Sequence, residues 1–215
     1  MAAEQRARKE RKGNADKRRR QILDAVYRSV VRHGLARTTL ATIADEAGLS
    51  QGVAVFYFKT KNGVLSEALR DLYETYTTHW QNALAEAEPD PVCQLAAIIA
   101  ADFAPVVCNP STLSVWFAFW GEQKFIPQYA EITAQFSTGR TRALLDIFTQ
   151  LVPGDEARAR DLAEWVDTLT DGYWQNQHLL PESFDPERAK HATLRFLCAV
   201  LPDYAERLEA CWMAS

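Results

Sequence analysis

The sequence predicts an all-α protein with about nine helices, divided into an N-terminal three-helix domain and a C-terminal helical bundle. Apolar residues recur every three or four positions along nearly every segment, and no segment shows the sustained alternation of a half-buried strand. Proline and glycine interrupt this pattern where helices would end. The chain has 215 residues, of which 47% are hydrophobic, enough for one good core or two modest ones.

The first fifteen residues are expected to form a disordered basic arm. Residues 1–20 hold nine Lys and Arg side chains and no apolar face. An arm of this kind can add phosphate or minor-groove contacts to DNA, or it can keep the protein soluble, and the sequence leaves both open. A first helix is expected from about Asp16 to His33, with Gly34 after it as the stop.

Residues 37–63, RTTLATIADEAGLSQGVAVFYFKTKNG, predict two short helices joined by a tight turn. The hydroxyls of Thr38 and Thr39 can cap the first helix. Gly48 follows its last apolar position and suits a left-handed helix end. The second helix is expected from Gln51 to about Tyr57. Two helices joined by a turn of about four residues that contains glycine are typical of a helix-turn-helix, whose second helix enters the DNA major groove.

The charge of the chain is divided unevenly. Residues 1–63 carry 14 Lys and Arg against 6 Asp and Glu, a net charge of +8, whereas the remainder carries 10 against 22, a net charge of −12. The formal net charge of −4 hides this division. It indicates that the N-terminal part meets a polyanion. We therefore expect a DNA-binding domain at residues 16–63.

The second domain is expected at residues 64–215. It begins in a long helix, from about Asn62 to Glu88, which would span about 40 Å at 1.5 Å per residue. Prolines at 89 and 91 end that helix. Five further helices are expected at about 91–107, 110–123, 127–151, 156–180 and 186–201.

Two aromatic clusters in this second domain predict a cavity for a cation. Trp116 and Trp120 lie four apart on one helix face, and Tyr173 and Trp174 lie in a later helix with Asp171 nearby. Aromatic faces attract cations, and a quaternary ammonium suits them best because it has no N–H groups to donate. A plain hydrophobic core is the alternative. The candidate ligand-binding residues are Tyr76, Phe103, Trp116, Phe119, Trp120, Asp171, Tyr173 and Trp174.

The N-terminal segment resembles the TetR family of one-component repressors, through the residues Thr39, Ile43, Ala44, Ala47, Gly48, Gly52, Tyr57, Phe58, Lys61 and Leu65. The resemblance implies phosphate contacts from Thr39, Tyr57 and Lys61, and a base contact from Gln51, whose amide suits adenine. Val55 and Phe56 depart from the polar residues of many relatives; exposed, they could only read thymine methyl groups, and Phe56 could instead turn into the core. The candidate DNA-binding residues are Thr38, Thr39, Ser50, Gln51, Gly52, Ala54, Val55, Tyr57 and Lys61.

Residues 116–127 and 171–174 resemble the ligand domain of the BetI-type repressors, which respond to choline and control glycine-betaine synthesis. Tyr173 and Glu122 depart from that pattern and leave open another betaine, a carnitine-like compound or an unrelated amphiphile. The resemblance implies a homodimer on a pseudo-palindromic operator. The candidate interface residues are Leu162, Trp165, Val166, Leu169, Leu194, Leu197 and Leu201.

Other classes of protein fit less well. An all-helical enzyme could pair Asp171 with His178, but the sequence has no nucleophile elbow, phosphate loop or metal-spaced ligands. We expect no cofactor and no metal. A nucleoid-type DNA binder without an effector is a third reading. No signal peptide or membrane-spanning run is evident, so we expect a cytoplasmic protein whose four scattered cysteines are thiols.

Overall fold

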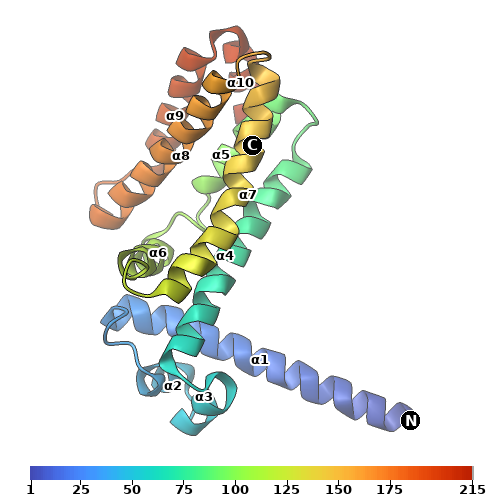
Figure 1. Cartoon of the computed structure of the whole chain (residues 1–215), viewed down its shortest axis with the longest axis vertical. Helices are drawn as coiled ribbons and strands as arrows, with labels where there is room; N and C mark the ends of the chain where they lie inside the picture. Colours follow the sequence, from blue (N-terminus) through green and yellow to red (C-terminus); the bar gives the residue numbers. More distant parts are fainter. Residues whose placement is uncertain (215) are drawn as a thin grey trace. The chain divides into compact units, whose positions relative to one another are not determined.

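The protein is all-helical (Figure 1). The computed structural model describes residues 1–214, except for the side chains at 2–4, 6–12 and 214. Among these residues are ten α-helices, one 3-10 helix and no strand, which confirms the predicted class with one α-helix more than expected. The elements are α1 (Ala2–His33), α2 (Leu40–Ala47), α3 (Gln51–Phe58), α4 (Lys61–Glu86), α5 (Pro91–Asp102), α6 (Pro110–Glu122), α7 (Pro127–Leu151), α8 (Glu156–Leu179), α9 (Pro186–Val200), η1 (Pro202–Tyr204) and α10 (Ala205–Ala214). None of the described helices combines the length and hydropathy needed to cross a bilayer.

The chain forms two compact units. Unit 1 comprises Met1–Asp71 and Ser114–Ala130, and unit 2 comprises Leu72–Leu113 and Glu131–Ser215. This division differs from the predicted boundary at residue 63, because the first part of α4 belongs with the N-terminal helices. The hydroxyl of Tyr27 on α1 donates to the Asp71 carboxylate at 2.6 Å.

Helix α1 begins at Ala2, so its backbone is helical where the sequence predicted a disordered arm over residues 1–15. The physical reason is local: Ala, Glu, Gln, Arg and Lys dominate residues 2–12, and all of them are strong helix formers. The helix ends at His33, as expected, and Gly34 follows in a conformation with φ 76° that favours glycine.

Unit 2 is built around α5. Nine of its twelve residues are buried, so this helix has no solvent-facing stripe. The C-terminal helix α10 packs against α5 and α9. A disulfide joins Cys93 of α5 to Cys211 of α10. The prediction that all cysteines are thiols is therefore wrong for this pair, because a separation of 118 residues gave no sign that the fold brings the two together.

Candidate functional site

Helix α2 is fixed at both ends. At its start the Thr39 hydroxyl accepts a hydrogen bond from the Thr42 amide at 3.1 Å, and the Thr42 hydroxyl accepts one from the Thr39 amide at 2.8 Å. At its end Gly48 is left-handed, with φ 63°, and the Leu49 amide donates to the Ala44 carbonyl at 2.9 Å. The turn that leads into α3 is therefore held by backbone and side-chain bonds.

Helix α3 has one buried side and one exposed side. Ala54 and Phe58 are buried, whereas Gln51, Val55 and Phe56 are exposed. The exposed fraction is 39% for Val55 and 70% for Phe56. A short helix that follows a fixed turn and presents its outer side chains to solvent has the form of a DNA-reading helix.

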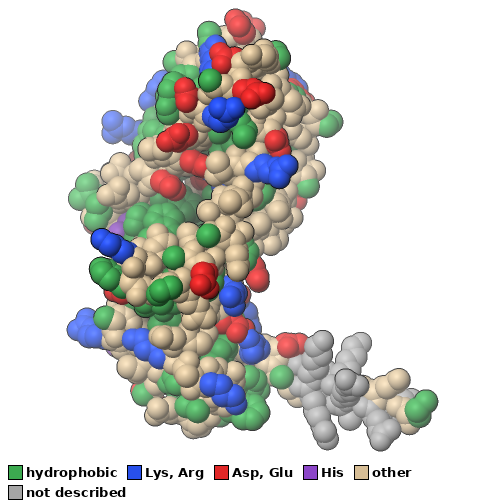
Figure 2. Space-filling model, viewed as in Figure 1, with side chains coloured by type: hydrophobic (Ala, Val, Ile, Leu, Met, Phe, Trp, Pro, Cys, Tyr) green, Lys and Arg blue, Asp and Glu red, His purple; other side chains and the backbone are tan. Residues whose placement is uncertain are grey.

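The side chain of Phe56 does not turn into the core, which was one of the two predicted alternatives. Its ring packs edge-on against Tyr57, with 5.2 Å between the ring centroids. The ammonium of Lys59 lies 5.5 Å from the centre of the Phe56 ring. Lys59 follows the last residue of α3 and has a positive φ. The end of α3 therefore presents an apolar ring beside a cation. Several Lys and Arg side chains lie on unit 1 on the face drawn in Figure 2.

A second group of side chains lies inside unit 2, around Asp102 at the end of α5. The Tyr76 hydroxyl donates to the Asp102 carboxylate at 2.8 Å, and the Trp174 indole N–H donates to the Asp102 carbonyl at 2.8 Å. The rings of Tyr76 and Trp174 lie 5.4 Å apart in an edge-on arrangement. Phe103 lies 5.8 Å from Tyr173 by ring centroids. Two aromatic side chains therefore bond to a buried acid.

We call Tyr76, Asp102, Arg140, Asp167, Asp171 and Trp174 the acidic cluster, because it contains three carboxyl groups and one guanidinium. The guanidinium of Arg140 pairs with the carboxylates of Asp102 and Asp167. Burial raises the pKa of Asp102, and the Arg140 charge opposes that shift. Desolvation by nearby protein atoms raises the pKa of Asp171 to about 6, although the residue is exposed to solvent, and the Arg140 charge again opposes the shift. Three carboxyl groups therefore lie near one guanidinium.

The comparisons with known proteins identify the family of both parts of the chain. Residues 22–68 match the family model for bacterial regulatory proteins of the tetR family, and residues 91–202 match the model for the C-terminal domain of BetI-type transcriptional repressors. The chain belongs to the TetR family. Its C-terminal domain is of the BetI type, and this is a family of transcriptional regulators rather than enzymes.

Relatives and solved structures support this membership. The HTH-type transcriptional regulator BetI of Stenotrophomonas maltophilia is 30% identical over 189 residues, covering 87% of this chain and 94% of that protein. The BetI regulator of Burkholderia mallei is 31% identical over 178 residues, covering 82% and 90%. A putative transcriptional regulator of Pseudomonas aeruginosa PAO1 shares the fold with a TM-score of 0.76 at 22% identity, over 90% and 94% of the two chains. One from Saccharomonospora viridis, solved in complex with choline, has a TM-score of 0.74 at 20% identity, over 85% and 96%.

Two of the predicted DNA-binding residues of this TetR-family chain are buried. Thr38 has no exposed surface, and its hydroxyl donates to the Gly34 carbonyl at 3.0 Å and accepts from Ser29 at 3.3 Å. Ala54 also has no exposed surface, since it lies on the inner side of α3. The prediction that the side chains of Thr38 and Ala54 contact DNA directly is therefore wrong.

The remaining DNA-binding candidates lie at or near the surface. Thr39, Ser50 and Gly52 are exposed, and Tyr57 and Lys61 are half-buried. The Lys61 ammonium donates to the backbone carbonyls of Ala36 at 2.9 Å and Leu35 at 3.2 Å, so it also fastens the loop before α2 to the start of α4. Their contacts to DNA stay a prediction.

The eight ligand-binding candidates are divided between the units. Tyr76, Phe103, Asp171, Tyr173 and Trp174 belong to unit 2, where Tyr76 and Trp174 bond to Asp102 and Phe103 packs near Tyr173. The other three belong to unit 1, where the rings of Trp116 and Trp120 lie 5.7 Å apart and Phe119 packs edge-on against Tyr129 at 5.2 Å. The sequence did not predict that Asp102, Arg140 and Asp167 belong to the site. The one signal was Asp102 itself, a charged residue that directly follows the apolar run AAIIAA.

The predicted dimer face needs a larger correction. Leu162, Val166, Leu197 and Leu201 are buried within their own chain and are not available to a partner. Trp165 is 50% exposed, and with Leu169 and Phe196 it lines an apolar groove between α8 and α9. Leu194 is half-buried on α9. The surviving candidates are therefore Trp165, Leu169 and Leu194, and Phe196 joins them.

Proposed function

We propose that this chain is a transcriptional repressor that binds a pseudo-palindromic operator as a homodimer in the cytoplasm. The observation that carries the proposal is the exposed outer face of α3, with Gln51, Val55 and Phe56, behind a turn fixed by Thr39 and Gly48. In a two-fold dimer the two copies of α3 would enter successive major grooves, about 34–36 Å apart or a multiple of that distance.

The division of labour on the DNA follows from side-chain chemistry. Thr39, Tyr57 and Lys61 would bind phosphates and set the position on the duplex and the salt dependence. The Gln51 amide would bond an adenine edge. Val55 and Phe56 would contact thymine methyl groups, because apolar side chains have no other sequence-specific partner in the major groove.

The dimer would form through α8 and α9. Trp165 is the natural anchor, since a large aromatic side chain that is half-exposed in the single chain buries much apolar surface when a second copy covers it. Leu169 and Phe196 line the groove beside it. Under two-fold symmetry the same patch serves both partners.

We infer that the effector is choline or a related quaternary ammonium compound, and that the regulated genes serve glycine-betaine synthesis. The BetI-type domain, the choline-bound neighbour and the acidic cluster support this. Asp102 and Asp171 would supply negative charge, and Tyr76 and Trp174 aromatic faces. Effector binding releases the operator only to the extent that the ligand prefers the conformation that does not bind DNA.

A TetR-type regulator of another small amphiphile is the second candidate. Tyr173 favours it, because its ring contacts both Phe103 and Phe184 and so extends the aromatic surface beyond what a small ammonium needs. A betaine, a carnitine-like compound and a long-chain amphiphile are the ligands to compare.

Operator release tests the proposal. The operator is first selected from random duplexes, and release is then measured by gel shift with choline and with its neutral carbon isostere, 3,3-dimethylbutanol. We expect choline to act at a concentration at least about tenfold lower than the isostere, because only choline carries the charge. Operator binding that no quaternary ammonium relieves would reject the choline effector and retain the repressor.

A further inference from the structure

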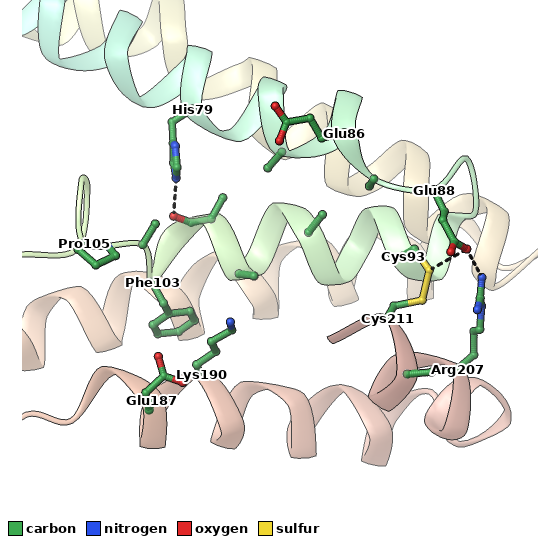
Figure 3. A pocket seen from close by; sticks show the side chains of 17 residues that line it. His79, Glu86, Glu88, Cys93, Phe103, Pro105, Glu187, Lys190, Arg207 and Cys211 are labelled. Atoms are coloured by element: carbon green, nitrogen blue, oxygen red, sulfur yellow. Dashed lines mark hydrogen bonds and ion pairs between the residues drawn. A yellow bond between two sulfur atoms is a disulfide. The ribbon is translucent and has the colours of Figure 1, made fainter. Parts of the chain in front are cut away.

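The disulfide between Cys93 and Cys211 lies at one end of a groove that the proposed function does not use (Figure 3). The groove has a volume of about 660 Å³ and is formed by side chains of α4, α5, α9 and α10, with the loops that follow α4 and α5. Alanines line much of it, and Phe103 and Pro105 lie toward its far end. Cys93 and Cys211 are buried, but both residues line this groove, which gives a small thiol or oxidant a route of approach to the bond.

We propose that Cys93 and Cys211 form a reversible thiol–disulfide switch that fastens the C-terminal helix to α5. In the forward step two thiols lose two electrons and two protons as the S–S bond forms. A peroxide accepts these electrons and protons; hydrogen peroxide is thereby reduced to two molecules of water. Reduction by two equivalents of a small thiol, such as glutathione, restores both S–H groups and leaves the thiol as its own disulfide.

The place where the regulator works argues for a switch rather than a permanent cross-link. A protein that binds chromosomal DNA works in a reducing compartment, and this step rests on the proposed function. Disulfides in such compartments are usually transient and redox-sensing. A pair that is oxidised in the fold and borders an open groove fits that class.

The second link between α10 and the rest of unit 2 is weaker. Arg207, one turn before Cys211, binds the carboxylates of Glu88 at 2.6 Å and Asp90 at 2.8 Å. This ion pair is exposed to solvent, and exposed pairs contribute little. The same carboxylates lie 3.8 and 3.7 Å from the Cys93 sulfur, where they would accept hydrogen bonds from its thiol in the reduced form. Reduction therefore leaves α10 held by packing and a weak ion pair.

The switch has a physical path to the effector site. Helix α5 runs from Cys93, near its start, to Asp102 at its end, which is the acid at the centre of the acidic cluster. Phe103 lines the groove and also contacts Tyr173. Loosening α10 frees one side of α5, so the reduced protein is expected to hold the effector less tightly.

Thermal unfolding of the full-length protein with and without reductant tests the proposal. We expect a thiol reductant to lower the Tm of the wild type by about 5–15 °C, since a disulfide that closes a long loop stabilises a domain substantially. Cys93→Ser and Cys211→Ser should show the lowered Tm in both conditions. Cys198→Ser, which removes a cysteine outside the disulfide, is the matched control and should respond as the wild type does. Amide hydrogen exchange should rise in residues 205–214 upon reduction.

Reversibility is measured by trapping free thiols with an alkylating agent, denaturing the protein and determining its mass by mass spectrometry. We expect about 10 mM reduced glutathione to open the Cys93–Cys211 bond, and oxidised glutathione or peroxide to close it. A bond that persists in reduced glutathione would be a fixed cross-link and would overturn the switch. Failure of every oxidant to join the two thiols would also overturn it. So would the binding of one zinc ion per chain by Cys93, Cys211 and Asp90, because the ligand atoms of these three residues lie within 4.8 Å of one another. None of these readouts involves DNA, so failure here leaves the repressor proposal intact.

Discussion

The outer face of α3 and the acidic cluster around Asp102 are built in opposite ways. The face of α3 comes from eight consecutive residues, and the turn before it is fixed by bonds between residues at most five apart. The acidic cluster collects side chains from α4, α5, α7 and α8, and its bonds join residues 26 to 72 apart. The face of α3 is therefore set by residues close together in the sequence, whereas the acidic cluster forms only when the whole of unit 2 folds.

The largest expected effect is on the cluster. Arg140→Ala leaves the buried Asp102 carboxylate without its cation and should lower the free energy of unfolding by about 3–5 kcal/mol. Arg142→Ala, on the exposed side of the same helix, is the control and should change it by less than about 0.5 kcal/mol. Urea unfolding measures both. Equal small losses would mean that the cluster does not hold unit 2 together.

The next effect concerns the dimer. Trp165→Glu places a charge where the second copy would pack and should weaken dimerisation by at least about 100-fold, consistent with an anchor worth about 3 kcal/mol. Sedimentation of a dilution series measures this. Val106→Ala removes another exposed apolar side chain and should leave the dimer unchanged. A Trp165→Glu protein that stays dimeric would exclude the α8–α9 groove as the interface.

On the local site the expected effect is smaller and has no stability component. Phe56→Ala should weaken operator binding by about 10-fold, through lost thymine contact, and leave the Tm unchanged because the ring is exposed. The matched control is Phe125→Ala, with a ring that is 71% exposed outside α3. If the two variants bind the operator alike, Phe56 does not read DNA.

The smallest effect is a pH dependence. Asp171, with a pKa near 6, is mostly ionised at pH 7.5 and mostly protonated at pH 5, so choline affinity should fall up to about tenfold as the pH falls between these values. Because folding raises this pKa from 3.8, the group lowers the stability of the fold as the pH rises from about 4 to about 6 and keeps it lowered above that, by a small amount because Asp171 is exposed. Asp171→Asn should therefore raise the Tm at pH 7.5 but not at pH 4, and remove the pH dependence of binding. Calorimetric titration at both pH values measures the affinity, and an unchanged profile in the variant would assign the dependence to another group.

The same contrast explains what the sequence could predict. The helix-turn-helix was predictable because Thr39, Gly48 and the apolar spacing of α2 act over a few residues. The acidic cluster was not, because nothing in the neighbourhood of Arg140 indicates that Asp102 lies against it. Tertiary packing also decided which leucines on α8 and α9 face inward: Leu162 and Leu197 occupy helical positions that suit either a core or an interface, and periodicity cannot separate the two.

The disulfide illustrates the same limit more sharply. Cys93 and Cys211 are separated by most of unit 2, and their pairing depends on the packing of α10 against α5. By contrast, the helical backbone of residues 2–15 was predictable in principle, because helix propensity is a local property. The low hydrophobicity of the segment predicts disorder, but its strong helix formers favour the helical backbone.

The most direct test of the central claim, that the outer face of α3 reads DNA sequence, is the ratio of operator affinity to random-duplex affinity for the wild type and for Gln51→Ala combined with Val55→Ala. Fluorescence anisotropy at fixed salt gives both affinities. The wild-type ratio should reach at least about 10³, and the double variant should lose at least tenfold of it while its binding to random duplex stays within about twofold. A ratio that the double variant leaves unchanged would contradict the claim.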